Sequence, residues 1–309
     1  MRPALKPGLL PVWRDRDTVQ IGIDSRRAVA LTGMAGVAWL IGLLDGSRDR
    51  AQVIEAAGDR GIPGPTVERV LALLASAGAL DDFPAATLRL LSAPARARLA
   101  AELATVSLAH GDGDGGARTL ARRLGSSVRL HGGGKVGAAL TDLLAASGVG
   151  QVGPADPRPS RARSAVPDLA ILIGRYSQEL QADLMREQIP HLAVSAGEAI
   201  GMVGPLVLPG RSACLRCLDL ARADRDPAWP LILAQLAGRE PDPPACDAPL
   251  AAAVAAQAAF QVLAFIDRAG PAAAVTSGTL ELVLPGWQWR RRTWPPHPRC
   301  TCGAPGTRA

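Results

Sequence analysis

Two short apolar stretches near the N-terminus carry the first structural signal of the chain. Residues 18–23 alternate apolar with polar or small side chains and are rich in β-branched residues, which predicts a strand. Four polar residues, 24–27, separate this stretch from a second apolar one at 28–31. The pattern therefore predicts a β-hairpin.

Helical periodicity follows the hairpin, and three helices are predicted, near 33–44, 50–57 and 65–77. The third has Pro63 and Pro65 at its start and Gly78 just after its end, the usual order of helix boundary residues. Strands followed by three short helices are typical of a winged-helix domain of the α+β class. We assign residues 1–83 to this domain.

A helical linker is expected over residues 84–125. Residues 84–105 are rich in Ala, Leu and Arg and predict a helix, whereas the glycine- and aspartate-rich residues 111–116 have little capacity to pack. Residues 126–309 then form the predicted second domain.

Strand and helix patterns alternate through the second domain. Strands are predicted at 127–131, 149–153, 168–174, 191–195 and 201–208, with helices at 138–146 and 178–187. This alternation indicates an α/β, Rossmann-like domain with a mostly parallel sheet covered by helices. Two later strands, 275–284 and 288–293, meet at Pro285-Gly286 and predict a terminal hairpin.

A glycine-rich turn separates the first strand of this domain from its helix. Gly132, Gly134 and Gly137 match G-x-G-x-x-G, and Asp156 lies about 20 positions further on. Such a turn allows a nucleotide phosphate to approach the helix N-terminus. The same turn also occurs wherever a strand and a helix pack closely, so nucleotide binding and simple packing both remain open.

Composition and charge exclude some classes of function. The net charge of +6 is carried by 32 arginines and only two lysines, Lys6 and Lys135. The one dense basic cluster, Arg290-Arg291-Arg292, has tryptophans nearby, but it is interpreted as an exposed strand with solvated arginines. We therefore expect no nucleic-acid partner.

Membrane insertion is not expected either. The longest apolar run, residues 250–266, is alanine-rich, is interrupted by Gln257 and Gln261, and is at the lower limit of length for a membrane span. It predicts a buried helix. The first 17 residues lack the apolar segment of a signal peptide, so a cytoplasmic location is predicted.

Four cysteines lie in two pairs, Cys214-x-x-Cys217 and Cys300-x-Cys302, with 82 residues between the pairs. Four thiolates complete a closed tetrahedral zinc shell, which is a structural rather than a catalytic arrangement. A redox pair and disulfides are the alternatives, and disulfides rarely persist in a reducing compartment. The fifth cysteine, Cys246, is interpreted first as a small apolar residue.

Motifs across the chain resemble a known family. Residues 127–302 resemble the ThiF/MoeB-type, ubiquitin-activating-enzyme-like fold, through the glycine turn, the CxxC, a Pro-initiated alanine-rich helix and the terminal cysteine pair. A subset is closer still, namely the partner proteins of YcaO-type cyclodehydratases in thiazole/oxazole-modified peptide (bacteriocin) pathways. The matching segments are 191–194, 204–210, 214–220, 226–230 and 297–302. Residues 1–83 are similar to the PqqD-like recognition element of such proteins.

The chain departs from the catalytic members of the family at the nucleotide site. Those members place Asn, Arg, Gln and Lys residues after the acidic residue that binds the ribose, and an Asp on a later strand. Here residues 157–167 contain no Asn, Gln or Lys, and Gly174-Arg175-Tyr176 stands where the later Asp is expected. We therefore expect zinc as the only cofactor, little or no ATP chemistry and no catalytic residue in this chain.

The resemblance implies a binding module. The N-terminal domain would bind the leader of a ribosomally made precursor peptide by β-augmentation of its hairpin, between residues 19–23 or 28–31 and the helix at 65–77. Candidate contact residues are Val29, Leu31, Val67, Val70, Leu71 and Leu74, for which ordinary core packing is the alternative. The second domain would be a homodimeric scaffold that docks a YcaO-type cyclodehydratase. The rival hypothesis is a ThiF-type adenylyltransferase that activates a peptide carboxylate.

Overall fold

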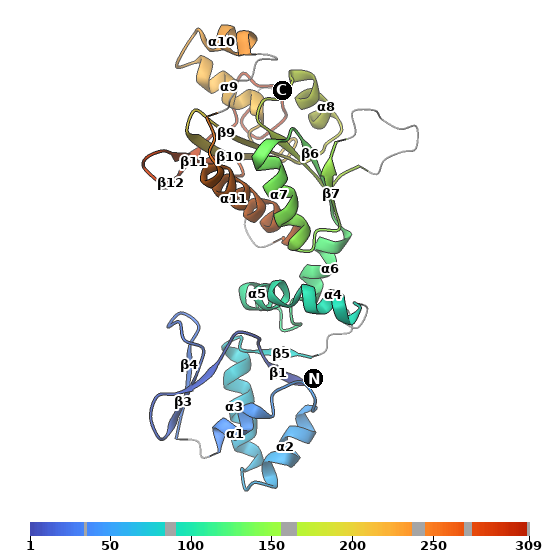
Figure 1. The fold of residues 1–309 in the computed structure, drawn as a ribbon, viewed down its shortest axis with the longest axis vertical. Helices are drawn as coiled ribbons and strands as arrows, with labels where there is room; N and C mark the ends of the chain where they lie inside the picture. Colours follow the sequence, from blue (N-terminus) through green and yellow to red (C-terminus); the bar gives the residue numbers. More distant parts are fainter. Residues whose placement is uncertain (34–35, 84–90, 156–165, 237–244, 269–273, 308–309) are drawn as a thin grey trace. The chain divides into compact units, whose positions relative to one another are not determined.

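A computed structural model describes residues 1–33, 36–83, 91–155, 166–236, 245–268 and 274–307. The chain forms two compact units, Met1–Ala121 and Arg122–Ala309 (Figure 1). Each unit has its own apolar core.

Unit 1 contains two small antiparallel sheets. Strand β1 (Pro3–Leu5) pairs with β5 (Leu80–Asp82), and a three-stranded sheet has the order β2-β3-β4. The predicted hairpin is confirmed as β3 (Thr18–Ile21) and β4 (Val29–Thr32). Strand β2 (Pro11–Trp13) was not predicted, because three residues are too few to show an alternating pattern.

Three helices complete the core of unit 1, close to their predicted positions. They are α1 (Val37–Gly42), α2 (Arg50–Gly58) and α3 (Gly64–Ser76). Helix α2 begins with a capping box, in which the Asp49 side chain accepts from the Gln52 amide and the Gln52 side chain accepts from the Asp49 amide. Helix α3 buries its apolar face against β3 and β4.

A buried charged group connects α5 to the small ribbon of unit 1. Helices α4 (Ala93–Arg98) and α5 (Ala100–His110) both lie within this unit. The ammonium of Lys6 on β1 is 1% exposed, donates to the Ser107 carbonyl at 2.6 Å and lies 3.4 Å from the Asp81 carboxylate. The Ser107 hydroxyl donates to the same carboxylate at 2.7 Å. Burial of one charge is offset here by an opposite charge and by hydrogen bonds.

Unit 2 is built on a seven-stranded sheet with the order β12-β11-β10-β9-β8-β6-β7 (Figure 1). Strands β6, β7, β8 and β9 run parallel. They are followed by β10, β11 and β12, which are each antiparallel to the strand before. The bounds are Ser127–His131, Gln151–Pro154, Leu169–Ile173, His191–Gly197, Ile200–Val207, Gly278–Val283 and Trp289–Thr293 for β6 to β12 in chain order.

The prediction of a mostly parallel sheet is wrong. Among the described residues three of the six strand pairings are antiparallel. The reason is a two-residue turn between β9 and β10, where Glu198 and Ala199 both have positive φ (54° and 58°). Such a turn returns the chain directly beside the strand it has left. Neither residue is the Asn or Gly typical of this turn, so the sequence did not reveal it.

Helices cover both faces of the sheet. On one face α7 (Gly134–Ala146) and α11 (Ala248–Asp267) share a core with the strands. On the other face lie α8 (Gln178–Arg186) and α9 (Leu215–Ala223), with α10 (Trp229–Leu236) after α9. Helix α6 (Ala117–Gly125) spans the boundary between the units.

Helix α11 confirms the predicted buried helix. By length and composition alone it could cross a membrane, but half of its most apolar window is buried within the protein. Val254, Ala258 and Val262 on this helix are fully buried in the core of unit 2. Its apolar character is therefore accounted for by packing against the sheet and α7.

A buried ion pair fixes the start of unit 2 to the end of α11. The Arg123 guanidinium contacts the Asp267 carboxylate at 2.6 and 2.9 Å, and both side chains are at most 6% exposed. Arg123 also donates to the Ser147 carbonyl at the end of α7. Three segments far apart in sequence thus meet at one guanidinium.

Arg123→Ala is expected to lower the free energy of unfolding of unit 2 by about 3–5 kcal/mol, because it leaves the Asp267 charge buried without its ionic partner. Hydrogen–deuterium exchange of β8 and α11 measures the effect within unit 2. Arg186→Ala is the control, because the Arg186–Asp183 pair is exposed and contributes at most ~0.5 kcal/mol. Equal exchange in both variants would contradict the assigned role.

Candidate metal centre and neighbouring sites

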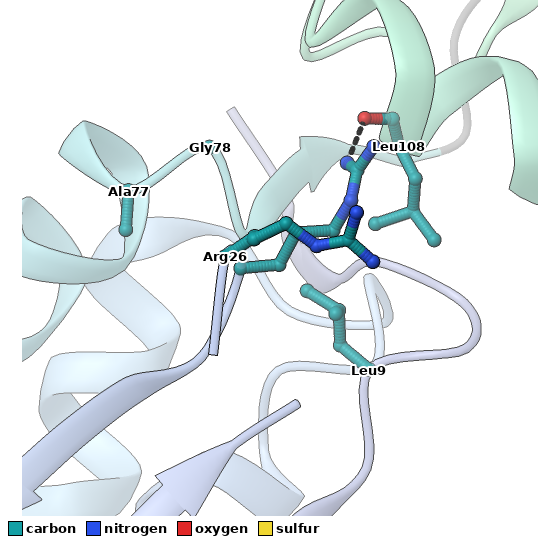
Figure 2. A pocket seen from close by; sticks show the side chains of 6 residues that line it. Leu9, Arg26, Ala77, Gly78 and Leu108 are labelled. Atoms are coloured by element: carbon teal, nitrogen blue, oxygen red, sulfur yellow. Dashed lines mark hydrogen bonds between the residues drawn. The ribbon is translucent and has the colours of Figure 1, made fainter. Parts of the chain in front are cut away.

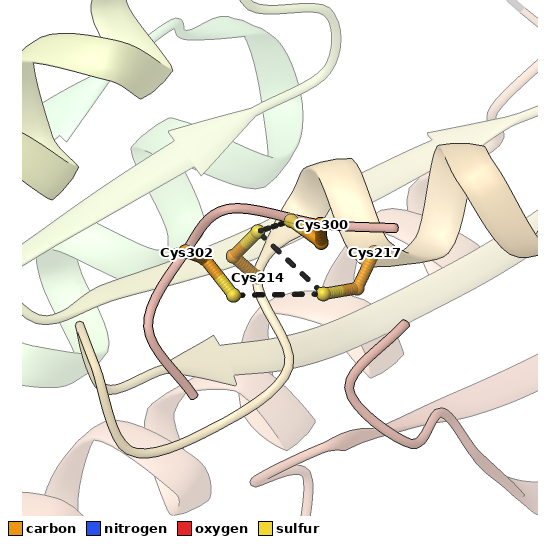
Figure 3. A group of neighbouring side chains, drawn as sticks. All are labelled: Cys214, Cys217, Cys300 and Cys302. Atoms are coloured by element: carbon orange, nitrogen blue, oxygen red, sulfur yellow. Dashed lines mark hydrogen bonds between the residues drawn. The ribbon is translucent and has the colours of Figure 1, made fainter. Parts of the chain in front are cut away.

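The four paired cysteines come together on the face of the sheet that carries α9 (Figure 3). Cys214 is the N-cap of α9, and Cys217 lies in its first turn. Cys300 and Cys302 come from the tail that follows β12. Cys214, Cys217 and Cys300 are almost fully buried, and their thiols belong to the apolar core on this face.

The spacing of the sulfur atoms fits a tetrahedral metal. Cys214 Sγ lies 3.8 Å from Cys217 Sγ and 3.6 Å from Cys300 Sγ, and Cys217 Sγ lies 3.7 Å from Cys302 Sγ. Zn–S bonds of about 2.3 Å in a tetrahedron give a sulfur–sulfur separation of about 3.8 Å. All four cysteines are free thiols rather than disulfides. The cluster could therefore hold a metal such as zinc.

Burial and mutual contact shift the protonation of the thiols. A hydrogen bond from Cys214 lowers the pKa of Cys217 to about 5, and the same bond raises the pKa of Cys214. Burial raises the pKa of Cys300 to about 11. Without a metal these thiols would therefore keep most of their protons at neutral pH. A metal ion would displace those protons, since thiolate is the ligating form.

A polar contact that sequence reasoning missed holds the tail against α9. Asp224 is the C-cap of α9, and its carboxylate contacts His297 Nε2 at 2.8 Å and the Arg299 guanidinium. The Arg299 amide donates to His297 Nδ1, so Nε2 carries the proton given to Asp224. His297 stands in the motif that contains Cys300, but nothing in the sequence pointed to Asp224.

Trp294 covers the junction between β12 and the tail. Its indole N–H donates to the Thr279 hydroxyl at 3.0 Å, and the side chain is 2% exposed. The Arg292 guanidinium lies over the ring, 4.4 Å from its centroid. Arg290, Arg291 and Arg292 on β12 are exposed, as the sequence predicted.

The glycine turn lies where the parallel strands β6 and β8 end. Gly132 has φ +105°, and a Cβ atom there would lie 2.3 Å from the Ile173 carbonyl oxygen, so only glycine fits. Gly134 also has a positive φ and begins α7, and Gly137 packs against the Ile173 side chain. Strand order reverses between β6 and β8, the usual place for ligands in such sheets.

The cations nearest this turn are bonded to main-chain carbonyls. Lys135 Nζ lies 3.3 Å from the Cys246 carbonyl, and Arg175 donates to the Leu236 carbonyl at 2.8 Å. Burial raises the pKa of the Cys246 thiol, which disfavours the thiolate a nucleophile needs. Asp156, the predicted ribose ligand, lies outside the described residues.

The six predicted peptide contacts lie in the core of unit 1. Leu31, Val67, Val70, Leu71 and Leu74 are at most 6% exposed, and Val29 packs against them from β4. Core packing, the alternative weighed for these residues, describes their position here. A peptide could reach only the backbone and the exposed side chains beside them.

No family model and no curated protein matches the chain. Solved structures do match. The heterocyclase TruD has a TM-score of 0.70 at 18% identity, over 98% of this chain. MccB of E. coli, solved with AMPCPP and MccA, has a TM-score of 0.68 at 13% identity, over 99% of this chain and 100% of its own.

These likenesses concern the fold. The chain spans only 43% of the length of TruD, and at these identities it shares an architecture rather than a demonstrated activity. The ThiF-like fold predicted from the motifs is supported by both structures.

Cys300→Ser is expected to abolish stoichiometric zinc binding and to destabilise unit 2, because structural metal binding is coupled to folding. Metal content by mass spectrometry and thermal unfolding measure the two effects. Cys246→Ser is the matched control, since Cys246 lies outside the cluster and should leave both unchanged. A metal-free Cys300→Ser protein with unaltered unfolding would contradict a structural role.

Proposed function

We propose that unit 1 binds an extended segment of a precursor peptide and that unit 2 presents it to a separate YcaO-type cyclodehydratase. The observation that carries the proposal is the free edge of β4. Likeness to the heterocyclase TruD and to MccB, which was solved with its peptide MccA, supports a role in peptide modification. Unit 1 would then serve as a PqqD-like, winged-helix recognition element.

The edge of β4 is suited to pairing with another strand. Strand β3 is central in its sheet, so of the two segments considered for β-augmentation only β4 has an unpaired side among the described residues. Gly33 N donates to the Asp17 carbonyl and Leu31 pairs with Val19, so hydrogen-bonded pairs alternate along the hairpin. The main-chain groups of Ala30 and Thr32 therefore point away from β3, towards an added strand.

Unit 2 would act as a scaffold stabilised by zinc in the four-cysteine cluster. Lys135 and Arg175 are bonded to carbonyls, and the family's Asn, Gln and Lys set is missing from the sequence. These features favour a partner without its own adenylation activity. Tethering the peptide beside the enzyme raises its effective concentration without chemistry in the tether. We further propose a homodimer that works in the cytoplasm, where the thiols stay reduced.

Selection of short random peptides displayed on phage against the full chain tests peptide binding. Ala30→Pro is expected to weaken binding of the selected peptides about tenfold, because it removes one outward N–H at the β4 edge. Fluorescence anisotropy of synthetic selected peptides gives the affinities. Ala30→Thr, which keeps the N–H and suits a strand, should bind like the wild type. Equal binding by all three proteins would place the peptide elsewhere, and no enrichment at all would remove the proposal.

The second candidate is a ThiF-type adenylyltransferase. It is favoured by the Gly132 turn at the strand switch point and by the likeness to MccB, which was solved with AMPCPP. It would bind ATP at the start of α7 and activate a peptide carboxylate.

Calorimetric titration of zinc-loaded protein with ATP and Mg²⁺ separates the two functions. We expect no binding at about 1 mM nucleotide, near the upper end of ordinary substrate affinities, because positioned cations around the phosphates are lacking. Binding at about 1 μM would instead favour the adenylyltransferase. A known nucleotide-binding protein titrated in the same buffer controls for sensitivity.

A further inference from the structure

A polar pocket of unit 1 lies where the β3–β4 turn meets the end of α3 (Figure 2). Its volume is about 410 Å³. The lining residues are Leu9, Arg26, Arg27, Ala77, Gly78 and Leu108. Two guanidinium groups thus line a cavity whose other walls are small or aliphatic.

Arg26 already shows that this turn can hold a carboxylate. Its Nε and Nη2 contact the two Asp24 carboxylate oxygens at 2.9 and 2.7 Å, the two-point geometry in which arginine binds carboxylates best. This contact lowers the pKa of Asp24 to about 2. The Arg26 side chain is 86% exposed and Asp24 is half exposed, so a second carboxylate could compete for the same guanidinium.

Arg27 is oriented towards the cavity by a single bond. It donates to the Leu108 carbonyl on α5, the bond drawn in Figure 2. A guanidinium has five N–H donors, so Arg27 keeps donors for a ligand. Leu9 and Leu108 supply apolar surface that the methylene groups of an acidic side chain could contact.

The pocket lies at the beginning of the free β4 edge. Val29, the first residue of β4, follows Arg27 by two positions, and Gly78 follows the last turn of α3. A strand added to β4 would advance about 3.4 Å per residue, so its end beside Val29 would lie within one or two residues of the arginines.

We infer that this pocket takes an acidic side chain, Asp or Glu, of the peptide bound along β4. The inference rests on the proposed peptide binding and adds the substrate class: an extended peptide with a carboxylate at one end of its paired segment. Arg26 and Arg27 would set this specificity, and Asp24 would occupy the site until the peptide displaces it.

The displayed peptides provide the test, because fusion at their C-termini leaves side chains as their only carboxylates. Wild-type protein should enrich peptides with Asp or Glu at one fixed position relative to their apolar residues. Arg26→Gln and Arg27→Gln should each weaken a selected acidic peptide roughly fivefold to tenfold. Asp24→Asn, which removes the internal competitor, should strengthen it. Arg16→Gln, in the β2–β3 turn, makes the same charge change away from the pocket and should have no effect.

The outcomes separate this inference from the proposed function. Enriched peptides that depend on Ala30 but carry no acidic position would overturn the acidic pocket and leave β4 binding intact. Equal weakening by Arg16→Gln would indicate a general charge effect and would also overturn it. Circular dichroism of the Arg27→Gln protein checks its fold, and Arg26→Gln, at an exposed side chain, provides the reading if that fold is lost.

Discussion

The four-thiol cluster is the constraint on which unit 2 depends most. It joins the first turn of α9 to a tail that is 82 residues further along the chain and would otherwise have only a short strand to anchor it. Three of the four cysteines are core residues, so the metal centre and the apolar core on this face form one structure. His297 and Trp294 then fix the path of the tail on either side of its cysteines.

The sheet of unit 2 divides into two halves with different tasks. Its parallel half brings the ends of β6 and β8 so close that Gly132 is required there. Its antiparallel half leads the chain through β11 and β12 towards the metal centre. The nucleotide-type turn thus persists as a packing solution, while the nearby cations are bonded to carbonyls. A fold shared with enzymes can in this way serve as a scaffold.

Unit 1 combines a closed core with an open edge. The apolar side chains that sequence patterns offered as peptide contacts are already buried against one another. What remains for a partner is the backbone of β4, together with the arginines at its beginning. Recognition through main-chain bonds gives affinity with little demand on sequence, whereas a charged pocket adds the specificity that the edge lacks.

The sequence by itself determined the features that depend on neighbouring residues. The hairpin at 18–32, the helices of unit 1, the buried α11 and the ligand set of the metal centre were all readable, because periodicity, boundary residues and paired cysteines are local signals. Only the tertiary structure decided the direction of β10, the burial of Val67 and Leu74, the contact of Asp224 with His297 and the pocket beside Arg27. Each of these depends on contacts between segments far apart in the chain, whose geometry no local pattern records.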